Sequence, residues 1–138
     1  EARIFVGVQT GGAAEREALF AQLTRKGYAL ADLSGNDAAK LHVRYMVGGH
    51  AANIENELLY RFEFPERPGA LLNFLNQMKS DWNISLFHYR NHGAAYGRVL
   101  CGMQVTKRKR SEFQSFLDGL GYCYRKETDN PAYRMFLG

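Results

Sequence analysis

A glycine turn between a strand pattern and a helix pattern is the part of this sequence best suited to hold a small charged ligand. Residues 62–75 read Phe-Glu-Phe-Pro-Glu-Arg-Pro-Gly-Ala-Leu-Leu-Asn-Phe-Leu. Backbone N–H groups at the start of a helix attract a carboxylate or a phosphate, and leucines at helical spacing place apolar surface beside the turn. We therefore expect a site for an aliphatic amino acid, although the glycine could also serve only to make the turn tight. The expected site comprises Pro68, Gly69, Ala70, Leu71 and Leu72.

Residue types that bind metals or catalyse reactions do not occur in a convincing arrangement. His88 and His92 are four residues apart, but they lie on a strand that runs into a turn and have no nearby cysteine. A zinc site normally needs three or four ligands at defined spacings. No serine, histidine and aspartate motif is present either. We expect no metal site and no catalytic residues in this chain.

Composition limits the remaining classes of protein. The 138 residues include 46% hydrophobic residues and carry a net charge of +4, which fits one modest domain or two small ones. No apolar run approaches the roughly 18 residues of a membrane span, and the first residues resemble a strand rather than a signal peptide. Cys101 and Cys123 lie in separate strand-like runs, as expected for free thiols of a cytoplasmic protein.

Hydrophobic periodicity and Gly/Pro punctuation predict an α+β fold. Strands are expected at residues 3–9, 28–33, 58–64, 82–89, 96–106 and 122–126. Helices are expected at residues 13–25, 38–47 and 68–79, with Pro68 at the first helical position, and from Ser111 and Asn130 onward. Ser111 and Gln114 have the spacing of a capping box. From Leu58 the order is βαββαβ, which is the ferredoxin-like plan.

An internal repeat divides the chain. Residues 3–9 match 98–104, Gly27-Tyr28 matches Gly121-Tyr122, and residues 44–48 match 134–138. Residues 1–49 therefore repeat only the second half of the βαββαβ unit. We interpret them as the C-terminal half of a first subdomain, 50–57 as a connector, and 58–138 as a complete second subdomain. The incomplete copy indicates a fragment of a longer protein whose open sheet edges pair in a homo-oligomer.

Four phrases carry a resemblance to a known family, and together they cover most of the chain. They are Lys40-Leu-His-Val-Arg-Tyr-Met-Val-Gly-Gly49, Phe62–Leu75, Trp82-Asn-Ile-Ser-Leu-Phe-His-Tyr-Arg90 and Asn130-Pro-Ala-Tyr-Arg-Met-Phe-Leu137. In this order they resemble the C-terminal regulatory region of the biosynthetic threonine deaminases, also called threonine ammonia-lyases or threonine dehydratases. The resemblance implies two ACT-like subdomains, of which this chain would hold one and a half.

The resemblance also implies how such a chain would act. In this family isoleucine binds the regulatory region and inhibits, whereas valine binds and opposes the inhibition. The parent enzyme is typically a homotetramer, and its pyridoxal phosphate is attached to a lysine of a separate catalytic domain. The Ser-Phe-Lys type of motif that carries this lysine is absent here. We therefore expect no cofactor and no deaminase activity in this chain alone.

Strand 83–90 supplies the other expected effector residues. The His-Tyr-Arg phrase of the family belongs to effector binding and signalling, so the resemblance singles out Tyr89 and Arg90, with Arg44 of the inter-subdomain phrase as a secondary candidate. Strict alternation would place Ile84, Leu86 and His88 on one face and Ser85, Phe87 and Tyr89 on the other. Phe87 therefore joins the expected site. Alternatively, Tyr89 is only a half-buried aromatic side chain of the sheet and Arg90 only a solvated charge. The sequence leaves open whether there is one effector site or two.

Two other classes of function fit the βαββαβ plan less well. RNA-binding RRM domains share it, and the net charge is positive, but they need an aromatic-rich central strand. Residues 96–105 lack those stacking aromatics, so we expect no nucleic-acid partner. A small ferredoxin-like enzyme would need a convergent acid, base or nucleophile, and none is visible. The sequence favours a regulatory module that binds an amino acid.

Overall fold

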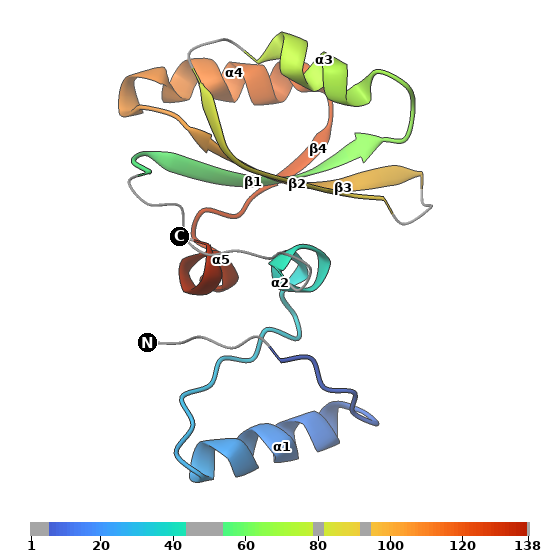
Figure 1. Ribbon diagram of the computed structural model, residues 1–138, viewed down its shortest axis with the longest axis vertical. Helices are drawn as coiled ribbons and strands as arrows, with labels where there is room; N and C mark the ends of the chain where they lie inside the picture. Colours follow the sequence, from blue (N-terminus) through green and yellow to red (C-terminus); the bar gives the residue numbers. More distant parts are fainter. Residues whose placement is uncertain (1–5, 44–53, 79–81, 92–94, 138) are drawn as a thin grey trace. The chain divides into compact units, whose positions relative to one another are not determined.

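A four-stranded antiparallel sheet forms the centre of the second of two units into which the chain divides (Figure 1). Its strands lie in the order β2-β3-β1-β4, and the elements follow one another as β1-α3-β2-β3-α4-β4. The strands are β1 (Glu57–Pro65), β2 (Asn83–Arg90), β3 (Tyr96–Gln104) and β4 (Cys123–Lys126). The predicted ferredoxin-like α+β fold is thereby confirmed.

The structure is a computed structural model that describes residues 6–43, 54–78, 82–91 and 95–137. Its two compact units are Glu1–Asn36 and Asp37–Gly138. Helix α2 (Asp37–Leu41), which the repeat assigns to the first copy, thus groups with the second unit. Most of the predicted connector 50–57 and the secondary candidate Arg44 lie outside the described residues.

One face of the sheet, here called the aromatic face, carries Tyr60, Phe62 and Phe64 of β1. Helices α3 (Ala70–Gln77) and α4 (Arg110–Leu120) cover it. The ring of Phe62 lies 5.3 Å from that of Phe74 on α3 in a T-shaped contact, a geometry that aromatic pairs prefer. Four side chains of α4 are buried against this face: Phe113, Phe116, Leu117 and Leu120. Hydrophobic burial on this face is what holds the second unit together.

The opposite face, here called the polar face, carries Glu57, Arg61 and Glu63 of β1. Helices α2 and α5 (Pro131–Phe136) lie on this side, away from α3 and α4 (Figure 1). Arg61 pairs with Glu127 at 3.1 Å and with Asp37 of α2 at 3.3 Å, while Tyr133 of α5 donates to Glu57. Charged hydrogen bonds therefore help to attach the two helices to this face, where Ala39 of α2, Ala132 of α5 and Leu59 of β1 are also fully buried.

Helix starts were predicted with mixed success. Asn130 caps α5 as expected, because its side-chain oxygen accepts from the Ala132 N–H at 2.9 Å. The capping box at Ser111 is wrong: α4 starts at Arg110, directly after a 3₁₀ turn, Lys107–Lys109. Pro68 is also not the first helical residue, because α3 starts at Ala70 and Gly69 precedes it with a left-handed φ of 85°.

Strand β2 contains an irregularity that changes which face its residues occupy. Its pairing with β3 shifts between Ile84 and Leu86, as in a β-bulge. Ile84 pairs with Met103 and packs against the aromatic-face core, whereas Leu86 and His88 lie on the polar face. The predicted sharing of one face by Ile84, Leu86 and His88 is therefore wrong for Ile84. The predicted sharing of the other face by Ser85, Phe87 and Tyr89 is wrong for Ser85, which donates to Glu57 on the polar face.

The first unit contains helix α1 (Ala13–Arg25), which has the predicted bounds, and Gly27 follows it with a φ of 86° as expected for a C′ glycine. The predicted strands are wrong: residues 6–9 and 28–33 are not in a strand, and residues 3–5 lie outside the described part. Val6, Val8 and Tyr28 are 68%, 61% and 61% exposed. A strand needs neighbours to satisfy its backbone groups, and residues 6–36 contain no equivalents of β1 and β2.

Candidate functional site: the hollow between β1 and α3

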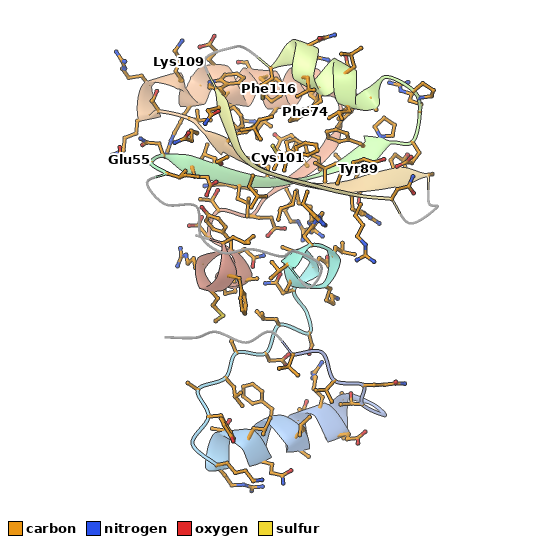
Figure 2. The ribbon with its side chains drawn as sticks, viewed as in Figure 1. Glu55, Phe74, Tyr89, Cys101, Lys109 and Phe116 are labelled. Carbon is orange, nitrogen blue, oxygen red and sulfur yellow. The ribbon has the colours of Figure 1, made fainter. Side chains whose placement is uncertain are left out.

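A hollow of about 790 Å³ lies where β1 ends and α3 begins. This volume falls in the range of about 300–1,000 Å³ that is usual for small-molecule sites. Tyr89 of β2 lies at this end of the sheet (Figure 2). The residues that line the hollow are Phe64, Pro65, Glu66, Arg67, Pro68, Gly69, Ala70, Leu71, Leu72, Leu75 and Tyr89.

The turn that forms one side of the hollow is held by its own backbone. The Arg67 N–H donates to the Pro65 carbonyl at 2.8 Å, and the Ala70 N–H donates to the Arg67 carbonyl at 3.3 Å. Gly69 then takes a left-handed conformation that other residues rarely adopt. No side chain caps α3, so the first-turn N–H groups of Leu71 and Leu72 have no intrahelical acceptor. This end of the helix is suited to an anionic group.

The other side of the hollow is apolar. Leu71, Leu72 and Leu75 project from α3 and are 42%, 60% and 40% exposed. Phe64, which is fully buried, closes the base against the sheet. Exposed leucines that gather beside a hollow are typical of a surface that binds another molecule.

A carboxylate and a phenol complete the lining. The Tyr89 hydroxyl donates to Glu66 Oε1 at 2.5 Å, and Asn91 Nδ2 donates to Glu66 Oε2 at 2.9 Å. The hydrogen bond to Glu66 raises the pKa of Tyr89, with smaller contributions from burial and from the charge of Glu66. Tyr89 therefore stays a neutral donor at physiological pH.

Gly97 on β3 makes room for this pair. A Cβ atom at this position would lie 2.6 Å from Glu66 Oε1 and 2.7 Å from the Tyr89 hydroxyl. Any larger residue would push the two side chains apart, because contacts below 3.0 Å essentially never occur for a real Cβ. The missing side chain at Gly97 thus allows the hydrogen bond between Glu66 and Tyr89.

The expected site residues fall into three groups. Six of them line the hollow: Pro68, Gly69, Ala70, Leu71, Leu72 and Tyr89. Phe87 and Arg90 do not line it. Arg90 lies opposite Arg98 in the register of β2 and β3, on the polar face. Arg44 lies outside the described residues. A role of these residues in effector binding stays a prediction.

The sequence interpretation missed two charged residues in the lining, Glu66 and Arg67. Both belong to the phrase Pro-Glu-Arg-Pro-Gly, directly before the glycine. A pair of opposite charges directly before a glycine turn and a helix start was the available signal.

The polar face contains a contact between two histidines that the sequence analysis did not predict. Nδ1 of His42, just after α2, lies 2.9 Å from Nδ1 of His88 on β2. Burial, followed by the charge of His88, lowers the pKa of His42 to about 3. In the described part of the chain no group of three or more metal-ligand side chains occurs. The pair is thus a neutral contact between a helix and the sheet.

Cys101 is buried and Cys123 is exposed, and both are free thiols. Burial raises the pKa of Cys101 to about 12, so its thiol is unreactive at physiological pH. Among the described residues, no helix combines the length and apolar character needed to cross a membrane.

The βαββαβ sheet, with a ligand-sized hollow at its β1–α3 turn, places the second unit in the ferredoxin-like class, to which ACT-like regulatory domains belong. Comparison with known families gives a specific result: the model of the C-terminal regulatory domain of threonine dehydratase matches residues 48–137. The chain belongs to this family.

Full-length relatives agree with this assignment. The chain is 52% identical over 136 residues to the biosynthetic L-threonine dehydratase IlvA of Burkholderia multivorans, covering 99% of this chain and 27% of that protein. It is 52% identical over 135 residues to the IlvA of Escherichia coli, covering 97% and 26%. For the mitochondrial threonine dehydratase of Saccharomyces cerevisiae the identity is 53% over 116 residues, covering 84% and 20%. The chain thus spans about a quarter of the length of its bacterial relatives.

Proposed function

We propose that this chain is the allosteric effector-binding part of a threonine dehydratase, in which isoleucine inhibits and valine opposes the inhibition. The observation that carries the proposal is the hollow at Gly69, where an uncapped helix start adjoins three exposed leucines. Family membership supports a regulatory role, and the hollow supports a small ligand that is anionic at one end and aliphatic at the other.

In the proposed complex the ligand carboxylate accepts from the first-turn N–H groups of α3, and the aliphatic side chain packs on Leu71, Leu72 and Leu75. Isoleucine and valine differ by one methylene, whose burial contributes about 0.8 kcal/mol. Such a small difference cannot by itself produce opposite effects. Each ligand must favour a different conformation of the whole enzyme, through one site or two.

The rest of the enzyme is part of the same proposal. A catalytic domain outside this chain holds pyridoxal phosphate and deaminates threonine, while this chain supplies no catalytic residue. The enzyme is a homo-oligomer of the cytoplasm, and the free thiols Cys101 and Cys123 are compatible with that compartment. Exposed Val6, Val8 and Tyr28 support a further point: residues 6–36 complete another ACT-like sheet with a segment of the enzyme outside this chain.

Isothermal titration of this chain with isoleucine, valine and aspartate tests the proposal. We expect heat of binding with the two aliphatic amino acids and none with aspartate, whose charged side chain cannot pack on the leucines. If neither isoleucine nor valine binds, the proposed effector site is wrong.

A matched pair of glycine variants tests the location of the site. Gly69→Val forces a β-branched residue into a left-handed turn, so isoleucine should bind about tenfold more weakly or worse. Gly27→Val introduces comparable strain after α1, where φ is 86° and space is also open, and should leave the affinity unchanged. Equal affinities for both variants would show that the Gly69 turn is only structural.

A further inference from the structure

We infer that Glu66 is the residue that binds the α-ammonium group of the ligand, and that it makes the hollow selective for amino acids over carboxylic acids of the same shape. This inference rests on the proposed function, because it assigns one end of the same ligand. Glu66 lines the hollow, but the proposed contacts between the ligand carboxylate and the start of α3 do not involve it.

Hydrogen bonds to both the backbone and the side chain of Glu66 fix the position of its carboxylate. The Glu66 N–H donates to the Ala95 carbonyl at 3.0 Å, which anchors its backbone next to the start of β3. Its side chain accepts from Tyr89 and Asn91 at 2.5 and 2.9 Å. Gly97 leaves the space that this arrangement needs. A carboxylate held in this way is preorganised to receive a cation.

The charge of Glu66 has no protein counter-ion within the described ranges. Both of its hydrogen-bond donors are neutral, and none of the ion pairs among those residues includes it. Glu63, two residues before the end of β1, shows the contrast, because it pairs with Arg98 on the polar face. A carboxylate has about four acceptor positions, so Glu66 keeps acceptor capacity for a further donor.

An α-amino acid supplies what this carboxylate lacks. Its ammonium group brings three N–H donors and one positive charge, while its carboxylate needs the donors at the Gly69 turn, three residues along the chain. The hollow therefore offers an acceptor and a donor group to the two charged ends of one ligand. A charge-assisted hydrogen bond contributes enough to discriminate by about 10- to 100-fold.

The test compares isoleucine with 3-methylpentanoate, which has the same carbon skeleton and carboxylate but no amino group. Titration calorimetry of the unmodified chain should give an affinity for isoleucine about 10- to 100-fold higher than for 3-methylpentanoate. Glu66→Gln removes the charge but keeps an oxygen that accepts from Tyr89. In this variant isoleucine should lose most of that advantage, while the affinity for 3-methylpentanoate stays the same or rises.

Two control variants separate recognition of charge from a structural role. Tyr89→Phe removes one of the two hydrogen bonds to Glu66 but leaves the carboxylate held by Asn91, so most of the preference for isoleucine should persist. Glu63→Gln makes the same chemical change on the polar face and should not alter the ratio of the two affinities. Thermal unfolding followed by circular dichroism verifies that each variant is folded.

The outcomes distinguish the inference from the proposed function. If the unmodified chain binds isoleucine and Glu66→Gln keeps the full preference over 3-methylpentanoate, the role of Glu66 is wrong and the effector site stands. Loss of preference in Tyr89→Phe as well as in Glu66→Gln would mean that the pair only shapes the hollow, and would also overturn the inference. If the unmodified chain binds no amino acid, both proposals fail.

Discussion

The two copies of the internal repeat share a sequence pattern but reach different structures. Residues 98–104 lie in β3, between β1 and β2, whereas the matching residues 6–9 are outside any strand with Val6 and Val8 exposed. The second copy has both neighbours of its central strand, and the first copy has neither in residues 6–36. The comparison teaches that the pattern Arg-x-x-x-Gly-x-Gln indicates a strand only where a sheet is available to receive it.

Helices behave differently in the same comparison. Helix α1 forms in the first copy as α4 does in the second, and Gly27 and Gly121 follow them with φ values of 86° and 71°. Helix α2 likewise precedes the end of the first copy as α5 does in the second. A helix satisfies its hydrogen bonds within its own segment, so it forms without a neighbouring sheet. The copies therefore agree in local elements and differ in non-local ones.

The largest difference between the copies should appear in native-state hydrogen exchange. Amides of β3 from Val99 to Gln104 should open with nearly the full free energy of unfolding, about 5–10 kcal/mol. Amides of residues 6–9 should exchange at close to the rate of a free peptide, because no strand pairing protects them. Strong protection of residues 6–9 would contradict the difference between the copies.

Removal of an aromatic ring from the core should destabilise the second unit and leave the first unit unaffected. Phe62→Ala leaves a cavity between β1 and α3, and we expect a loss of about 3–5 kcal/mol in the free energy of unfolding of the second unit. The nuclear magnetic resonance signals of α1 should be unaffected, since its residues contribute no buried side chain. Equal weakening of Phe20→Ala, a half-exposed ring on α1, would argue against separate units.

The contact between α2 and the sheet should weaken in acid. Burial holds the pKa of His42 at about 3, below its ordinary 6.5, so the unfolded chain binds a proton that the folded chain excludes. The contribution of neutral His42 to the free energy of unfolding is fully present above pH 6.5. It is lost as the pH falls towards 3, by up to about 1.4 kcal/mol per pH unit. Urea unfolding at pH 7, 6 and 5 measures the slope.

His42→Leu is the matched variant for that slope, because it removes the titrating group and keeps the apolar volume. Its stability should depend less steeply on pH than that of the unmodified chain. Arg61 and Arg90 also disfavour the charged form of His42. Both arginines are present in the variant and in the unmodified chain, so a difference between the two slopes comes from His42. Identical slopes would contradict a role for His42.

The smallest effect should come from the two left-handed glycines that follow α1 and α4. Gly121→Ala and Gly27→Ala each force a side chain into a left-handed conformation, at a cost of about 1 kcal/mol. For Gly121 the cost should appear in the cooperative unfolding of the second unit. For Gly27 it should appear only as lower helicity of α1, measured by Cα chemical shifts. A shift of the main unfolding transition by Gly27→Ala would mean that the copies are energetically coupled.

Much of the fold could be predicted because its signals are local. Gly27 and the apolar spacing gave the bounds of α1, and Asn130-Pro131 gave the start of α5. The strands at residues 3–9 and 28–33 could not be decided in this way, because their formation depends on partners elsewhere in a sheet. The face of Ile84 was missed for a related reason, since a bulge is visible only in the pairing of two strands.

The candidate site was predictable in part for the same reason. The turn at Gly69 and the leucines after it lie within one short segment, and both line the hollow. Glu66 was missed because its meaning depends on Tyr89, 23 residues further along the chain, and on the space above Gly97. Such three-residue arrangements come from tertiary packing and leave no periodic mark in the sequence.

The bulge in β2 also has a consequence for protein aggregation. β2 is an edge of the four-stranded sheet, and a long regular edge can template the growth of amyloid-like fibrils. The register shift between Ile84 and Leu86 interrupts its row of backbone groups. A second chain could add regularly only along the five residues Leu86–Arg90, which is too short a stretch to extend readily. Deletion of Ser85 would straighten this edge, and the straightened protein should form thioflavin-positive aggregates faster than the natural one.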